Sequence, residues 1–252
     1  MNTGRTTEQH AGPYTDLRTS DRGATPRATA PLTAVGQAYT LIKESLLLGK
    51  YALGLRLVEE RLAREVGVSR TPVREALLRL HAEDLVFRHP SGGYSPTVPN
   101  IAEVRELYEV RVVLERSGIV RPKLSGRPHD ATVLQSIRDS WTAMALNPRT
   151  PSPEFVVFDE AFHVRLAEAS GNREMAAMLQ RVNERIRIVR MRDFLTMDRI
   201  VETINEHLGL IDLVIGGDLD GAIAAYDMHV QTSFDVVEQR VAGALLQMAS
   251  QR

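Results

Sequence analysis

The chain has 252 residues, of which 43% are hydrophobic and 25% charged, and a formal net charge of −1. This composition is typical of a soluble globular protein. It contains no cysteine, which excludes disulfides and thiolate metal sites and fits a cytoplasmic location. No run approaches the roughly 20 apolar residues of a membrane span, and the N-terminal segment lacks the apolar core of a secretory signal.

The charges are unevenly distributed along the chain. Residues 33–98 contain 9 Lys+Arg and 7 Asp+Glu, whereas residues 99–252 contain 18 and 22. A mildly basic N-terminal segment and an acidic C-terminal segment are expected if only the N-terminal segment contacts nucleic-acid phosphates. Residues 1–32 are rich in Thr, Gly, Pro, Ser and Arg without periodicity, which predicts a disordered arm.

The next 66 residues, 33–98, predict a winged helix-turn-helix domain. Apolar spacing predicts helices over 33–48, 59–66 and 71–82. Gly67 ends the second helix, Ser69 is placed at the N-cap of the third, and Pro72 lies in its first turn. Two short strands, 85–89 and 94–98, flank the turn at residues 90–93.

The rest of the chain shows helical periodicity and no strand signal. Helices are expected over 101–124, 129–146, 153–170, 172–194, 197–215 and 219–249, separated by Gly- and Pro-containing breaks. Several have one wide apolar stripe or two, as helices of a bundle do. The predicted fold is therefore mainly α: a winged helix-turn-helix, then an all-α antiparallel bundle over 101–249. We expect this second domain to be the effector-binding and dimerisation domain of the function given below.

The turn after Gly67 predicts the DNA-reading surface. Ser69, Arg70, Thr71 and Arg74 lie at the exposed N-terminal end of the third helix. Hydroxyls and a helix N-terminus suit phosphate oxygens, and an arginine can bond O6 and N7 of guanine. The bare backbone at Gly93 allows the wing to approach the minor groove. A single arginine on a helix is more often just solvated, so the prediction depends on the whole pattern.

Four residues of the second half form a candidate metal site. Asp159 and His163 are spaced i, i+4 on one helix face, and His207 and His229 each continue an apolar stripe. If they converge, a carboxylate and three imidazoles suit a divalent transition metal, with Zn²⁺ favoured over Ni²⁺ or Mn²⁺. A lone histidine on such a face is usually a hydrogen-bonded core residue.

Arg111 is the candidate effector-binding residue, since it continues the inner stripe of the first bundle helix. It can clamp a carboxylate or form an ion pair with Glu115, its i+4 neighbour, and both alternatives stay open. The arginines of residues 181–192 are expected on a solvated or interface face. Glu160 and Glu206 are expected to turn away from the metal ligands that they adjoin.

Residues 36–98 resemble the DNA-binding domain of the GntR superfamily, through Leu62-Ala63 followed by residues 67–77, GVSRTPVREAL. Residues 101–240 resemble the ligand-binding domain of its FadR subgroup, through residues 108–111, 159–163 and 206–207 and through His229. The resemblance implies DNA contacts by Ser69, Arg70, Thr71, Arg74 and Gly93. It implies metal ligation by Asp159, His163, His207 and His229, a set that disfavours a long acyl effector.

Two positions depart from the family pattern. Leu53 stands where the family usually has proline before glycine, and Asp84 stands where it usually has glycine before the wing. Both positions lie in turns, so we expect altered local geometry rather than loss of DNA binding.

The expected function is a homodimeric, ligand-responsive transcription regulator, by resemblance a repressor, that binds operator DNA, a divalent metal and a small organic acid. The alternative is a metal-dependent hydrolase or other enzyme with secondary DNA binding, because Asp/His₃ sites can activate water. The chain lacks a His-Glu-x-x-His run and an evident nucleophile arrangement, so we do not expect an enzyme.

Overall fold

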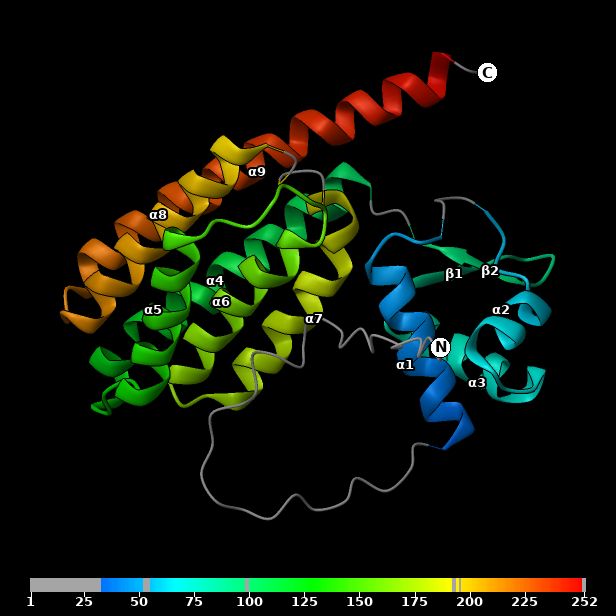
Figure 1. Ribbon diagram of the computed structural model, residues 1–252, viewed down its shortest axis with the longest axis horizontal. Coiled ribbons are helices and arrows are strands. Elements are labelled where there is room, and N and C mark those ends of the chain that lie inside the picture. Colours follow the sequence, from blue (N-terminus) through cyan, green and yellow to red (C-terminus); the bar gives the residue numbers. More distant parts are fainter. Residues whose placement is uncertain (1–32, 52–54, 98–99, 192–193, 195, 251–252) are drawn as a thin grey trace, which may run out of the picture. The chain divides into compact units, whose positions relative to one another are not determined.

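The computed structural model describes residues 33–51, 55–97, 100–191, 194 and 196–250. Within these ranges the chain forms nine helices and one two-stranded sheet (Figure 1). The predicted mainly α fold, a winged helix-turn-helix followed by a helical domain, is therefore confirmed. The predicted arm over residues 1–32 and the unusual Leu53 lie outside the described residues.

Three helices build the winged helix-turn-helix around a shared apolar core. They are α1 (Ala34–Leu47), α2 (Glu59–Val66) and α3 (Arg70–Ala82). Each contributes the inward stripe expected from its sequence, with Ile42, Leu62 and Leu77 fully buried. Gly67 has φ +71°, and its N–H donates to the carbonyl of Ala63. This left-handed residue ends α2 and lets the chain turn sharply into α3.

The wing is a short antiparallel hairpin of β1 (Val86–Arg88) and β2 (Tyr94–Pro96), with Phe87 opposite Ser95. Both strands are shorter than predicted. At the turn, Gly92 and Gly93 have φ of +86° and +81°, conformations that residues with a Cβ rarely adopt. Leu57 adds a single bridge to Tyr94, which joins the segment before α2 to the wing.

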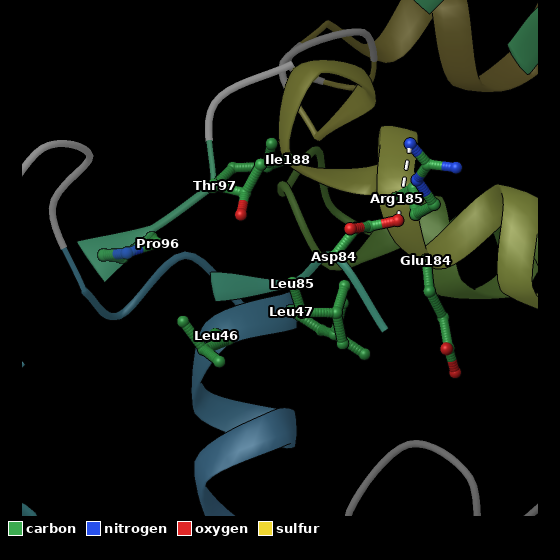
Figure 2. A pocket seen from close by; sticks show the side chains of 9 residues that line it. All are labelled: Leu46, Leu47, Asp84, Leu85, Pro96, Thr97, Glu184, Arg185 and Ile188. Carbon is green, nitrogen blue, oxygen red and sulfur yellow. Dashed lines mark ion pairs between the residues drawn. The ribbon is translucent and has the colours of Figure 1, made fainter. Parts of the chain in front are cut away.

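Asp84, which stands where glycine was expected, has the left-handed backbone that glycine favours. Its φ is +59°, the only positive φ of a non-glycine residue in the part of the chain that the structure describes. The backbone N–H groups of Asp84 and Leu85 donate to the carbonyls of His81 and Leu80. The side chain lines a shallow pocket, where it pairs with Arg185 at 3.8 Å (Figure 2). The turn therefore has the left-handed backbone that a glycine at this position would favour.

Six helices form the second domain. They are α4 (Ile101–Ser125), α5 (Ala131–Leu146), α6 (Phe155–Ala169), α7 (Arg173–Arg190), α8 (Met197–Ile215) and α9 (Leu219–Ser250). Helix α6 packs against α4, α5 and α7, and α8 packs against α5 and α9 (Figure 1). Helix α7 ends at Arg190, four residues before the predicted end.

Helix α6 is the central element of this bundle. Ten of its 15 residues are buried, among them Phe155, Val156, Val157, Phe162 and Leu166. A helix that is apolar on all sides lies in a core rather than on a surface. Two of its polar residues, Asp159 and His163, are held away from water, each 1% exposed.

We predict that backbone strain at Asp84 can be relieved. Asp84→Gly should stabilise the protein by about 0.5–1 kcal/mol, because glycine adopts a positive φ without a steric cost, and Asp84→Ala should destabilise it by about 1 kcal/mol. Both variants remove the carboxylate, so the difference between their free energies of unfolding in urea isolates the backbone effect. Equal stability of the two variants would contradict the prediction.

Candidate metal centre and nucleic-acid interface

The N-terminal end of α3 presents the predicted DNA-contacting side chains to solvent. Ser69, Arg70, Thr71 and Arg74 are all exposed, while Val73, Ala76, Leu77 and Leu80 hold the opposite face of the helix in the core. Ser69 has the extended backbone of an N-cap residue, but its side chain makes no capping hydrogen bond. The hydroxyl thus does not satisfy the helix N-terminus, which suits an anion.

A carboxylate of α2, which sequence reasoning missed, contacts both arginines. Glu59 Oε2 accepts from Arg74 Nε at 2.6 Å and lies 3.5 Å from Arg70 Nη2. The arginine side chains remain 61% and 58% exposed, so these ion pairs are weak in water. Gly93 is exposed at the wing turn. A Cβ atom at this position would lie 3.9 Å from Arg56 Nη1. Arg56 itself donates to Ser91 at 2.5 Å.

The four predicted metal ligands come together inside the bundle. Asp159 and His163 come from α6, His207 from α8 and His229 from α9. All four are buried, and one ligand atom from each lies within 4.8 Å of the others. The i, i+4 spacing and the two apolar stripes therefore do bring these side chains to one point.

The distances inside this cluster fit the coordination of a small cation. His229 Nε2 lies 3.2 Å from His163 Nε2 and 3.3 Å from His207 Nε2. Asp159 Oδ1 lies 3.6 Å from His207 Nε2. With Zn–N bonds of about 2.0–2.1 Å, ligand atoms at the corners of a tetrahedron lie about 3.4 Å apart. The nitrogens thus have nearly the spacing that a tetrahedral Zn²⁺ imposes.

Two carboxylates orient the imidazoles from outside the cluster. The Nδ1–H of His163 donates to Glu115, and that of His229 donates to Glu206 at 2.7 Å. In each neutral ring the proton then lies on Nδ1, so Nε2 carries a lone pair that points at the cluster. Burial lowers the pKa of His163 to about 4 despite Glu115, so this ring is neutral near pH 7.

Two such lone pairs face each other across 3.2 Å between His163 and His229. Facing acceptors repel unless a cation or a proton lies between them. The residues present therefore fit a divalent ion, and the donor set of three imidazoles and one carboxylate suits Zn²⁺.

Aromatic packing holds the third imidazole. The His207 ring stacks on Phe162 with ring centroids 3.9 Å apart, and Trp141 contacts it edge-on at 4.2 Å. Burial lowers the pKa of His207 well below its usual value. A rigid, dry and neutral imidazole is ready to bind a metal ion without rearrangement.

Asp159 stays ionised although it is buried. Burial alone would raise the pKa of this carboxyl, but the Arg190 guanidinium and the nearby histidines hold it well below its usual range. Arg190 Nη2 donates to Asp159 Oδ2 at 2.5 Å. The fourth ligand is thus a carboxylate, with one oxygen bound to Arg190 and the other facing His207.

Of the two alternatives for Arg111, the structure contains the ion pair with Glu115. Its Nε donates to Glu115 Oε1 at 2.5 Å, so the expected ion pair exists. Its Nη1 and Nη2 are buried without a hydrogen-bond partner among the described residues. Arg111 therefore retains two donors beside the cluster after pairing with Glu115.

The structure corrects two expectations about charged residues. Arg187 and Arg190 were expected on a solvated face but are 2% and 0% exposed, paired with Glu160 and Asp159. Glu206 was expected to turn away from the metal ligands, yet it accepts a hydrogen bond from His229. The i, i+3 spacing of Arg187 and Arg190 puts them on one helix face, but no local signal shows that this face is buried.

Comparison with known proteins follows the same division of the chain. Residues 34–95 match the family of bacterial regulatory proteins, gntR family, and residues 106–232 match the FCD domain. An HTH-type transcriptional regulator of Bacillus subtilis, YdhC, is 30% identical over 71% of this chain and 79% of its own length. The Nta operon transcriptional regulator of Aminobacter aminovorans is 29% identical over 77% of this chain and 90% of its own length.

Solved structures show the same fold. That of Escherichia coli McbR/YncC has a TM-score of 0.67 at 20% identity and covers 82% of this chain and 98% of its own. That of a GntR regulator from Rhodococcus has a TM-score of 0.61 at 20% identity and covers 83% and 98%.

Fold, exposed recognition helix and relatives together define a DNA-binding transcription regulator with a helical C-terminal domain. The chain belongs to the GntR family, with an FCD domain after its helix-turn-helix. Because these relatives and families are regulators, the expectation of a regulator rather than an enzyme is confirmed. Among the described residues, every helix is too short or too polar to cross a bilayer.

We predict that Zn²⁺ stabilises the protein through the four-residue cluster. Free Zn²⁺ at a thousand times its Kd should add about 4 kcal/mol to the free energy of unfolding, seen as a higher melting temperature. His229→Ala should abolish this gain. His129→Ala is the matched control, since His129 is half-buried on the Gly118 carbonyl, outside the cluster. Equal losses in the two variants would contradict the assignment.

The outer carboxylate Glu206 should tune metal affinity. Glu206→Ala removes the acceptor that orients His229, and loss of such a partner typically weakens metal binding 10- to 100-fold. Glu202→Ala is the control, because Glu202 lies one turn earlier on α8 and also pairs with Arg199. Titration with a competing chelator measures both, and a Glu206→Ala protein with unchanged Zn²⁺ affinity would show that Glu206 does not orient the ligand.

Proposed function

We propose that this protein is an operator-binding repressor whose helical domain holds a divalent metal ion and a small organic acid. The acid weakens DNA binding when it occupies the metal site. The single observation that carries the sensing role is the convergence of three buried imidazole nitrogens and one carboxylate, with distances that suit one cation.

The exposed end of α3 supports the proposed DNA contacts. Ser69, Arg70 and Thr71 lie at a helix N-terminus, where hydroxyls and backbone N–H groups favour phosphate oxygens. Arg74 is one turn further along, in reach of a base edge in the major groove. We assign Gly93 to the minor-groove side, because its bare backbone allows close approach.

The small size of a single winged helix-turn-helix domain favours a dimer. One winged helix contacts too few base pairs for specific binding, and symmetric operators mirror the two-fold symmetry of dimeric regulators. We propose residues 33–98 as the DNA-binding domain and 101–249 as the sensing and dimerisation domain, preceded by the arm over 1–32. The regulator named for the Nta operon is a relative of this kind, and we infer that this chain too controls an operon.

The acid is inferred from the chemistry beside the metal ligands. Four protein ligands leave a Zn²⁺ ion able to add a carboxylate oxygen, and Ni²⁺ or Mn²⁺ would leave two positions of an octahedron open. Arg111 offers two unpartnered donors beside them. A ligand that binds one conformation of the domain better shifts the protein toward it, and operator affinity changes by that difference in free energy.

The test is operator binding measured by fluorescence anisotropy with DNA from upstream of the protein's own gene. Arg70→Ala with Arg74→Ala should cost roughly 2–6 kcal/mol of binding free energy, since a good bidentate contact contributes about 1–3 kcal/mol. Arg79→Ala, at the far end of the same helix, is the control. No preference for this DNA over scrambled duplexes, with no effect of the double variant, would overturn the DNA role.

The sensing role is tested in the same assay with chelator, with Zn²⁺, and with Zn²⁺ plus small organic acids. We expect operator affinity to fall when an acid binds the metal-loaded protein, and His207→Ala to remove this response. A response to acid that survives both chelation and His207→Ala would place the effector elsewhere.

A further inference from the structure

Two arginine side chains beside the candidate metal centre are wholly buried and only partly hydrogen-bonded. Arg111 and Arg190 are both 0% exposed. Arg111 Nη1 and Nη2 and Arg190 Nε and Nη1 have no hydrogen-bond partner within the described ranges. Buried donors are nearly always paired in native proteins, so four unpaired N–H-bearing nitrogens at one place point to a missing acceptor.

Each guanidinium group pairs with a carboxylate at the candidate metal centre. Arg190 donates to Asp159 through Nη2, and Arg111 donates to Glu115, the partner of His163. His163 connects the two pairs, because its Nδ1 donates to Glu115 and its Nε2 lies 3.9 Å from Asp159 Oδ2. Both arginines thus pair with carboxylates that lie against His163, one at each nitrogen of its ring.

The charges around the site leave a deficit of negative charge once a metal is bound. Arg111 and Arg190 are balanced by Glu115 and Asp159, and Glu160 pairs with Arg187. A divalent ion held by neutral imidazoles adds two positive charges. Glu206, which accepts from His229, is only partly buried and also lies 3.5 Å from Arg199. Uncompensated charge in a dry interior is strongly unfavourable.

We propose that the effector is a small dicarboxylate, with one carboxylate on the metal ion and the second held between Arg111 and Arg190. This inference rests on the proposed function and deepens it. It makes Arg190 a specificity-determining residue, because a planar carboxylate matches the parallel N–H bonds of a guanidinium group. A monocarboxylate would neutralise only one of the two charges and leave an arginine unsatisfied.

The first experiment compares acids of equal carbon number on the Zn²⁺-loaded full chain by isothermal titration calorimetry. Succinate is paired with butyrate, and malonate with propionate. We expect at least one of the two dicarboxylates to bind at least tenfold tighter than its partner. Equal or tighter binding of the monocarboxylate in both pairs would overturn the inference. Glycerol phosphate, a dianion of different shape, would overturn it by binding tighter than both dicarboxylates.

The second experiment assigns that preference to Arg190. For the dicarboxylate that binds tighter, Arg190→Met should weaken binding at least tenfold. The same variant should weaken binding of the matched monocarboxylate less than threefold. Arg190→Lys should still bind the dicarboxylate more than threefold tighter than the monocarboxylate. The control is Arg138→Met, an exposed arginine that pairs with Asp212 on the surface. Equal weakening of both acids by Arg190→Met would show that Arg190 only supports Asp159.

Failure of this inference and of the proposed function are separable, because Zn²⁺ stoichiometry is measured on every sample. A chain that binds neither Zn²⁺ nor any acid overturns the proposed function. A Zn²⁺-loaded chain that binds acids without preferring two carboxylates overturns this inference alone. If Arg190→Met does not fold or loses Zn²⁺, the inference is tested by the acid pairs on the wild-type protein and by Arg190→Lys. Loss of the dicarboxylate preference in Arg190→Lys would then contradict the role of Arg190 in specificity.

Discussion

The helical domain of this protein is organised around imidazole lone pairs held face to face in a dry interior. Glu115 and Glu206 accept the Nδ1–H of His163 and His229, so each Nε2 points inward as an acceptor. Both rings are buried, His163 at 1% and His229 at 3% exposed, so the surrounding side chains restrict their rotation. A cation relieves this repulsion at once, which makes a metal ion the natural partner of the arrangement.

Holding such a cluster requires charged groups in the core, and the bundle supplies them in balanced pairs. Asp159, which would otherwise take up a proton on burial, is kept ionised by Arg190. Arg187 and Glu160 form a second buried pair. Breaking one member of a buried pair leaves an uncompensated charge, so the pairs restrict how the helices α6 and α7 can shift.

In the winged helix-turn-helix domain, by contrast, the charged side chains at the start of α3 remain exposed to water. Arg70 and Arg74 share the carboxylate of Glu59, but all three are accessible. In the proposed DNA contacts, Glu59 would have to be displaced before the guanidinium groups reach a base or a phosphate. Because exposed ion pairs contribute little, the exchange is inexpensive, while the pair limits the directions in which the arginines extend.

The sequence by itself determined the helices, the turn at Gly67, the wing and the resemblance to a GntR regulator, because apolar spacing and turn residues are local signals. It also singled out Asp159, His163, His207 and His229, which lie on inward stripes. The tertiary structure alone decided that Arg187 and Arg190 are buried and that Glu115 and Glu206 orient the histidines. Arg190 meets Asp159 across 31 positions and Glu115 meets His163 across 48. Whether a charged residue faces water or a distant partner depends on how the helices pack, and no local spacing encodes that.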